Sequence, residues 1–243
     1  MIVLFTDFGL AGPYTGQMMA VLHREAPEAP VVSLFADAPS ARPKPSAYLL
    51  AAYSAWFPAG TVLLCVVDPG VGSARRAVIA EADGRLYVGP DNGLFDIVMR
   101  RAAAARLWEI AWRPALLSAS FHGRDLFAPV AARLAAGETV AALARPASDE
   151  AAGRAWPDDL AEIVYVDHYG NAMTGLRGPA VPPAARLIAG NRKIEPAATF
   201  SAVPPGEAFW YVNSNGLAEI AVNGGRADTA LKLAVGSKIR VEE

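Results

Sequence analysis

The sequence predicts a mixed α/β protein: an N-terminal α/β/α domain with a mostly parallel sheet, followed by a C-terminal antiparallel domain that resembles a β-barrel. Over residues 1–150, short apolar runs alternate with longer stretches of helical periodicity, which is typical of a parallel sheet covered by helices. From Glu162 onward, period-two runs are separated by turn residues, as in small antiparallel sheets and barrels. Residues 147–159 carry Asp, Glu, Gly and Pro without an apolar period, so we place the domains at 1–155 and 156–243.

The strands predicted in the N-terminal domain are apolar runs too short for helices and bounded by Gly, Pro or Asp. They are Ile2–Phe5, Val31–Phe35, Val62–Val67 and Ala77–Ala80. The predicted helices are Tyr14–Arg24, Ser46–Phe57, Gly93–Ala103 and Leu126–Ala136. Pro13 suits a first helical position, and Gly137 is a stop signal. Asn92 and Asp125 are candidate residues for the starts of the last two helices.

The C-terminal domain is predicted to be built from short strands joined by tight turns. The strands are Ile163–Val166, Arg186–Ala189, Phe209–Val212, Leu217–Val222 and Lys238–Val241. The turns at 190–191, 213–216 and 223–225 are rich in Asn and Gly, which favour positive φ. No long helix is expected after Gly178.

Composition excludes several classes of protein. The chain has 243 residues, 53% hydrophobic and 19% charged, with a mean hydropathy of +0.24, whereas a disordered chain needs low hydrophobicity and high charge. A formal net charge of −2 gives no basic excess for a phosphate backbone, so no nucleic-acid partner is expected. The single cysteine, Cys65, allows neither an internal disulfide nor a multi-cysteine metal site, and no bound metal is expected.

The N-terminus and the hydropathy pattern predict a cytoplasmic protein without a membrane partner. The first apolar run ends at Asp7 and has no basic flank, so it is not a targeting signal. No run reaches the ~18 apolar residues that indicate a membrane-spanning helix.

Acidic residues follow two of the predicted strands, at the sheet edge where ligands bind in parallel sheets. In Thr6-Asp7-Phe8-Gly9, Asp7 is placed either to accept hydrogen bonds from a vicinal diol such as a ribose or merely to order the turn. In Val67-Asp68-Pro69-Gly70-Val71-Gly72, Asp68 points into the cleft or serves the turn, and Arg75 and Arg76 follow it. This segment lacks the third glycine of a dinucleotide fingerprint.

Two further motifs lie at predicted helix starts. Pro90-Asp91-Asn92-Gly93 has the residues of a turn that opens a helix, and we interpret it as structural. Phe121-His122-Gly123-Arg124-Asp125 contains a histidine beside a glycine and charged groups. His122 is either a structural hydrogen-bonding group or a catalytic one.

The C-terminal domain holds two polar turns. Asp167-His168-Tyr169-Gly170-Asn171 ends its first strand, and Asn213-Ser214-Asn215-Gly216 leads toward Glu219 between two later strands. Each is typical of a hairpin turn. Their hydroxyl, amide and aromatic groups also suit a nucleoside pocket.

Taken in order along the chain, these motifs closely resemble the S-adenosyl-L-methionine (SAM) hydrolase (adenosine-forming) family, which is related to the SAM-dependent fluorinase and chlorinase. The resemblance runs from Ile2 to nearly the last strand. It implies an N-terminal α/β domain, a C-terminal β-barrel domain, and no metal or second cofactor. It also implies a homotrimer in which each site lies between the N-domain of one subunit and the C-domain of the next.

The resemblance assigns roles to individual residues. The catalytic Asp–Arg–His set of the family falls on Asp68, Arg75 and His122, and its ribose-binding carboxylate falls on Asp7. Contacts to the nucleoside or methionine, to which Asp68 also contributes, fall in the C-domain on Asp167, Tyr169, Asn171, Tyr211, Ser214, Glu219 and the strand around Val222. Tyr169 stands where relatives often have phenylalanine, which preserves a stacking face.

The implied reaction is hydrolysis of SAM by water at ribose C5′, giving adenosine and L-methionine. The sulfonium leaves as neutral methionine and needs no acid. Arg75 and His122 are then expected to orient the water or favour its hydroxide character, and Asp68 to hold Arg75, bind the water or contact the substrate. The sequence leaves open which group takes the proton.

Two alternatives compete with the hydrolase. A halogenase would deliver chloride or fluoride to C5′, but a halide needs a dry pocket with few donors, and His122 and Arg75 argue for water. Gly123 stands where the fluorinase has a halide-contacting serine, although the chlorinase also has glycine there. A non-catalytic protein that binds adenosine or SAM would not need the Asp–Arg–His set.

Overall fold

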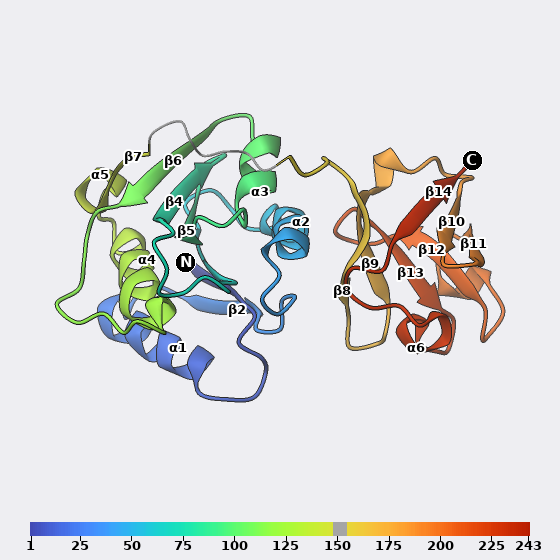
Figure 1. Ribbon diagram of the computed structural model, residues 1–243, viewed down its shortest axis with the longest axis horizontal. Helices are drawn as coiled ribbons and strands as arrows, with labels where there is room; N and C mark the ends of the chain where they lie inside the picture. Colours follow the sequence, from blue (N-terminus) through green and yellow to red (C-terminus); the bar gives the residue numbers. More distant parts are fainter. Residues whose placement is uncertain (148–154) are drawn as a thin grey trace. The chain divides into compact units, whose positions relative to one another are not determined.

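The computed structural model describes residues 1–147 and 155–243 (Figure 1). Its contacts divide the chain into two compact units, Met1–Arg154 and Ala155–Glu243. Each unit is built on a sheet of its own.

The first unit contains a 7-stranded sheet in the order β2-β1-β3-β5-β4-β6-β7. Strands β2, β1, β3 and β5 pair in parallel, and the remaining pairs are antiparallel. The parallel sheet predicted from the sequence is confirmed for these four strands, which an antiparallel part extends. The strands are β1 (Ile2–Thr6), β2 (Val31–Phe35), β3 (Val62–Val66), β4 (Ala77–Ala82), β5 (Arg85–Pro90), β6 (Ala105–Ile110) and β7 (Ala144–Pro146).

Helices cover both faces of this sheet. Met18 and Leu22 of α1 share one core with Ile2 and Leu4 of β1 and with the apolar face of α4. Helices α2 and α3 pack together on the opposite face (Figure 1). The helices are α1 (Tyr14–Glu25), α2 (Pro43–Ser54), α3 (Asp96–Arg101), α4 (Ala128–Ala135), α5 (Val140–Leu143) and a π-helical turn (Gly123–Phe127) that runs into α4.

Two predicted helix starts are wrong. Helix α3 begins at Asp96, because Gly93 has φ +99°, outside the helical region. Asn92 therefore does not cap it; its Oδ1 accepts the N–H of Leu94 at 3.3 Å. The sequence indicates that Asp125 caps or charges the start of the following helix. It does not cap it, since its Oδ2 accepts the N–H of Ser118 at 2.9 Å, but it does place a negative charge in the first turn of the π-helical segment.

Strand β5 escaped the sequence analysis because Gly89 and Pro90 are ordinary turn signals. The structure shows why glycine stands in this strand. A Cβ at Gly89 would lie 2.1 Å from the carbonyl oxygen of Cys65 in the neighbouring β3. Glycine thus allows β3 and β5 to approach closely, and their carboxyl ends meet at one edge of the sheet.

The second unit contains a 7-stranded sheet in the order β14-β10-β11-β12-β13-β9-β8. The two ends of this order are joined by hydrogen bonds: Ile163 donates its N–H to the Ser237 carbonyl at 2.9 Å, and Gly236 donates to the Ile163 carbonyl at 2.8 Å. The sheet is therefore nearly closed, as the barrel prediction required. The strands are β8 (Leu160–Val166), β9 (Ala172–Arg177), β10 (Arg186–Ala189), β11 (Arg192–Pro196), β12 (Ala208–Val212), β13 (Leu217–Val222) and β14 (Ile239–Glu242).

This unit departs from the prediction in one pairing and agrees with it on helices. Strands β11 and β12 pair in parallel, whereas the other pairs among the described strands are antiparallel. The only α-helix of the described second unit, α6 (Ala227–Leu231), has 5 residues, which is less than two turns. Across residues 1–147 and 155–243, no helix is long and apolar enough to cross a membrane.

Candidate active site

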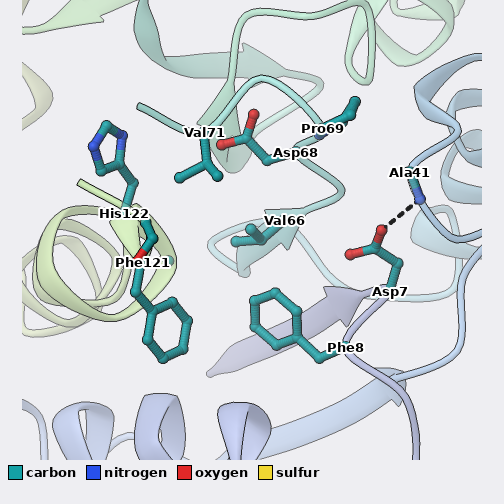
Figure 2. Close-up of a pocket in the computed structure, with 11 residues that line it drawn as sticks. Asp7, Phe8, Ala41, Val66, Asp68, Pro69, Val71, Phe121 and His122 are labelled. Atoms are coloured by element: carbon teal, nitrogen blue, oxygen red, sulfur yellow. Dashed lines mark hydrogen bonds between the residues drawn. The ribbon is translucent and has the colours of Figure 1, made fainter. Parts of the chain in front are cut away.

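A pocket of about 130 Å³ lies in the first unit at the carboxyl edge of β1 and β3 (Figure 2). Asp7 enters it directly after β1, Asp68 after β3, and His122 from the start of the π-helical turn. The parallel pairing of β1 with β3 places the two acidic residues at the same edge. The structure thus brings together three residues that the sequence analysis singled out separately.

Asp68, Arg75 and His122 form a continuous chain of hydrogen bonds. Arg75 Nε donates to Asp68 Oδ1 at 2.7 Å, and Arg75 Nη2 donates to Asp68 Oδ2. The same Nη2 lies 3.2 Å from His122 Nδ1. The side chains of Asp68 and Arg75 are only 4% and 9% exposed, so this two-pronged ion pair is largely screened from water.

The contact between Arg75 and His122 fixes the proton on the imidazole. A guanidinium has only donors and keeps its proton in proteins. His122 Nδ1 must therefore accept, and the neutral ring carries its hydrogen on Nε2. His122 is thereby a hydrogen-bond donor through Nε2.

The environment of His122 favours this neutral form. Burial lowers the pKa of His122, and the positive Arg75 guanidinium lowers it further, while Asp68 and Asp125 act in the opposite direction. Arg75 also makes a cation–π contact, since its Cζ lies over the Phe127 ring, 5.3 Å from the ring centre.

Asp7 is held by the backbone on the far side of the pocket. Its Oδ2 accepts the N–H of Ala41 at 2.7 Å (Figure 2). Burial raises the pKa of the Asp7 carboxyl, the bond from Ala41 lowers it, and the charge of Asp68 raises it. Ala41 has φ +55°, an uncommon conformation that often occurs where a structure holds a functional site in place.

Aromatic rings form the apolar wall between these polar groups. The rings of Phe8 and Phe121 face each other across the pocket wall (Figure 2), with their centres 5.7 Å apart in an edge-to-face arrangement. The Tyr14 ring lies 5.4 Å from that of Phe121. A Cβ at Gly123 would lie 3.2 Å from both Met18 Sδ and a Phe121 ring carbon. A side chain at Gly123 would therefore require the wall to move.

The second unit contains a separate polar cluster around Asp167 and Asn171. Asp167 Oδ1 accepts the backbone N–H of Asn171 at 2.8 Å, and Oδ2 accepts its side-chain Nδ2 at 3.1 Å. These bonds close the turn between β8 and β9. At its tip, Tyr169 is 74% exposed, which leaves the residue accessible for stacking against a ligand.

A buried carboxylate links β12 to β13 in the same unit. Tyr211 and Glu219 lie directly opposite each other in the antiparallel register. Glu219 is 2% exposed, and it accepts the Tyr211 hydroxyl at 2.5 Å and Asn213 Nδ2 at 2.7 Å. Burial raises the pKa of Glu219; the bonds from Tyr211 and Asn213 lower it, and the charge of Asp167 raises it.

Glu219 acts on the turn through Asn213, which the sequence analysis did not select. Asn213 Oδ1 accepts the N–H groups of Asn215 and Leu217 at 2.9 and 3.1 Å. This arrangement presents the exposed Ser214. The Val222 side chain is packed in the core of the unit, so Val222 itself can offer only its backbone groups to a ligand.

The sequence analysis also missed parts of the pocket in the first unit. Phe8, Ala41, Val71, Ser120 and Phe121 line it. Phe8 and Phe121 stand next to Asp7 and His122 in the sequence, and this adjacency is a signal that was available. Nothing in the sequence points to Ala41.

Among the residues that the structure describes, no group of three or more His, Cys, Asp or Glu side chains is placed to hold a metal ion. Cys65 is buried in β3 as a free thiol.

Comparison with known proteins relates both units to one family. Residues 2–144 match the SAM hydroxide adenosyltransferase N-terminal domain, and residues 161–240 match the C-terminal domain of the same family. An (R)-S-adenosyl-L-methionine hydrolase of Salinispora arenicola is 41% identical, with 97% of this chain and 95% of the relative covered. A protein of the same name from Thermus thermophilus is 37% identical, with 99% and 98% covered.

A more distant relative and a solved structure are also similar to this chain. A fluorinase of Actinopolyspora mzabensis is 25% identical over 76% of this chain and 78% of its own length. The crystal structure of a conserved protein from Thermotoga maritima superposes with a TM-score of 0.89 at 30% identity, with 100% of both chains covered.

The fold and the site define a two-domain α/β enzyme with its polar pocket at the carboxyl edge of the N-terminal sheet. Since both family domains match and the full-length relatives are 37% and 41% identical, the chain belongs to the SAM hydroxide adenosyltransferase family. The resemblance identified in the sequence is confirmed, and the fluorinase is a distant relative.

Proposed function

We propose that this protein hydrolyses SAM, with water attacking ribose C5′, to give adenosine and L-methionine. The observation that carries the proposal is the Asp68–Arg75–His122 chain beside the same pocket as Asp7, in a family whose full-length relatives are named (R)-S-adenosyl-L-methionine hydrolase. Those names support the diastereomer with an (R) sulfonium as the preferred substrate.

In the proposed reaction, water displaces methionine from C5′ in one step, and each polar group has a separate role. The C5′–sulfur bond breaks with its electron pair going to sulfur, so methionine leaves neutral, and the water oxygen forms the new bond to C5′. Holding the water in line with this bond supplies part of the ~7–11 kcal/mol available from ideal orientation. His122 donates from Nε2 to the water oxygen. Asp68 retains a lone pair on each oxygen beside Arg75 and accepts the proton that the water loses.

A chlorinase-like halogenase and a non-catalytic SAM-binding protein are the competing functions. Gly123 argues against a fluorinase, which has a serine there, but not against a chlorinase, which also has glycine. The Asp68–Arg75–His122 chain argues against both, because it supplies charge and hydrogen bonds suited to water. A protein that only bound SAM would have no use for this chain.

The products distinguish the three functions. Purified protein is incubated with (R)-SAM and (S)-SAM in ¹⁸O-labelled water, with and without chloride. We expect adenosine labelled at the 5′-oxygen, formed faster from the (R) diastereomer and independently of chloride. Formation of 5′-chloroadenosine establishes the halogenase, and unchanged SAM establishes a binding protein. Unlabelled adenosine contradicts attack at C5′.

The proposal extends to the rest of the assembly. A pocket of about 130 Å³ is smaller than the ~300 Å³ at which pockets for drug-sized ligands begin, which supports further walls supplied by the second domain. We therefore place the site between the domain formed by residues 1–155 of one subunit and the domain formed by residues 156–243 of the next, in a homotrimer. In this assignment Asp167, Tyr169, Asn171, Ser214 and the strand at Val222 contact the nucleoside or methionine, with Tyr211 and Glu219 in support.

Further parts of the proposal concern cofactors, partners and location. The reaction as written needs neither a metal nor a cofactor. A net charge of −2 supports the absence of a nucleic-acid partner. A free, buried Cys65 thiol is usual for proteins of the reducing cytoplasm, which supports a cytoplasmic location.

Replacement of Asp7 is expected to weaken nucleoside binding. Each hydrogen bond to a charged group contributes ~1.5–3 kcal/mol, so Asp7→Ala should raise the Kd for adenosine by about 10- to 100-fold. Asp7→Asn should also lose affinity, because one acceptor oxygen becomes a donor. Protonation of Asp7 removes its charge and should weaken binding. Since the pKa of Asp7 is raised, this loss should begin at a higher pH, on acidification, than for an ordinary Asp. Calorimetric titration provides the measurement.

The matched control is Asp83→Asn. Asp83 Oδ1 accepts the N–H groups of Ala103 and Ala104 at 3.0 and 3.3 Å in a turn after β4, at the opposite edge of the sheet. This variant should bind adenosine like the unmodified protein. Unchanged affinity in both Asp7 variants would remove Asp7 from the site.

A further inference from the structure

The loop that carries Asp68 and Arg75 leaves β3 at Val67 and returns to β4 after Arg76. Asp68 and Arg75 bond to each other. This contact within the loop does not fix the positions of the loop's two ends relative to the sheet. Two residues fix the loop to the sheet. They are Asp91 and Asn92, which directly follow Pro90, the last residue of the neighbouring strand β5.

Asn92 holds the first end of the loop. Its Nδ2 donates to the carbonyl oxygen of Val67 at 2.8 Å, and Val67 is the residue directly before Asp68. The Oδ1 of the same side chain accepts the N–H of Leu94 at 3.3 Å. Since both ends of the amide are used, its orientation is defined and the Val67 carbonyl is tied to the turn after β5.

Asp91 holds the second end of the loop. Its Oδ2 accepts Arg76 Nε at 2.8 Å, and its backbone N–H donates to the Arg76 carbonyl at 3.0 Å. That carbonyl also accepts Arg75 Nη1 at 3.2 Å. One carbonyl oxygen thus joins Asp91 to the guanidinium that contacts Asp68 and His122.

We propose that Asp91 and Asn92 are positioning residues that hold both ends of the 67–76 loop and so set the geometry of the Asp68–Arg75–His122 chain. Neither residue lines the pocket described above, so each acts through its neighbour in the loop. The inference deepens the proposed hydrolase and rests on it for the kinetic part. It gives a mechanical role to Pro90-Asp91-Asn92-Gly93, which the sequence alone indicated only as a turn.

The test compares Asp91→Asn and Asn92→Ala with the control Asp83→Asn. A displacement of about 1 Å at a reacting group costs up to ~10²-fold in rate. We therefore expect kcat for SAM hydrolysis to fall by about 10- to 100-fold in both variants with KM nearly unchanged. Asp91→Glu, which keeps the carboxylate, should recover part of the loss. Asp83→Asn should retain the kcat of the unmodified protein.

A second readout does not depend on turnover. The His122 ring signals are followed by NMR as the pH is varied, after assignment with His23→Gln and His168→Gln variants. Since the Arg75 guanidinium helps to hold down the pKa of His122, a displaced Arg75 should let this pKa rise in Asp91→Asn and Asn92→Ala but not in Asp83→Asn.

The outcomes separate the two proposals. A rise in the His122 pKa without any adenosine formation by the unmodified protein supports the positioning role and rejects the hydrolase. The positioning role is overturned if both folded variants keep the kcat and the His122 pKa of the unmodified protein. It is also overturned if Asp83→Asn changes these two quantities as much as the loop variants do. If Asn92→Ala does not fold, Asn92→Asp and the two Asp91 variants provide the same comparison.

Discussion

Arg75→Ala is expected to lower the rate of the chemical step by ~10²- to 10⁴-fold, the usual cost of losing a group that orients or deprotonates a nucleophile, while affinity for SAM changes little. The reason lies in the geometry: Arg75 contacts Asp68 and His122 at once, so its loss frees both from their positions. His122→Ala should show the same pattern. Single-turnover rates and equilibrium binding, measured separately, provide the test.

The Arg75 experiment needs a variant that still folds. Removing one member of a buried ion pair costs about 3–5 kcal/mol of stability, because Asp68 is left buried without its partner. Arg75→Lys keeps the positive charge but lacks the planar fork, and should lose rate with a smaller loss of stability in denaturant unfolding. Loss of affinity with an unchanged single-turnover rate would show that Arg75 binds substrate and does not serve the water.

The same chain predicts the pH dependence. Protonation of His122 places a hydrogen on Nδ1 and removes the acceptor for Arg75. Activity should therefore fall as the pH falls through the pKa of His122. This pKa is lowered by burial and by Arg75, so the acidic limb that belongs to His122 should lie below the ~6.5 of an ordinary histidine. In Arg75→Gln the limb should move to higher pH; an acidic limb that did not move would contradict the contact.

The position of the site could be predicted from sequence because parallel strands end at one edge. Strands β1 and β3 are short apolar runs with Asp7 and Asp68 just beyond them, and this pattern is visible without a structure. The Tyr211–Glu219 pair was also accessible, since a tight turn at 213–216 places these residues opposite each other. Local patterns suffice where the register of a strand decides the contact.

The contacts that define the chemistry could not be predicted in this way. His122 lies 47 residues from Arg75 in sequence, and their approach depends on how the 67–76 loop and the π-helical turn pack. The role of Ala41 depends on a backbone conformation with φ +55°, which alanine rarely adopts. For Arg75 and His122 the sequence resemblance supplied roles and the structure supplied the physical connection between them, whereas Ala41 was found only in the structure.

Glu219 and its partners Tyr211 and Asn213 also show the difference between roles taken from the resemblance and contacts found in the structure. Resemblance placed Tyr211 and Glu219 among groups that support ligand contacts, but the structure shows both Glu219 oxygens occupied by Tyr211 and Asn213. Glu219 therefore orders the turn that presents Ser214. Since Glu219 is only 2% exposed, any effect of Glu219 on a ligand is transmitted through Tyr211 or Asn213, the two side chains that bond to it.

Mixing two inactive variants is expected to restore activity. If each site combines the N-domain of one subunit with the C-domain of the next, Asp68→Ala damages one half of the site and Asn171→Ala damages the other. In an exchanged equimolar mixture about a quarter of the sites should contain two intact halves, because each half is chosen independently around the symmetric ring. Asp68→Ala mixed with His122→Ala is the matched control and should remain inactive, since both changes lie in the N-domain. Subunit exchange is verified by mass spectrometry of tagged and untagged protein, and no rescue after proven exchange would place each site within one chain.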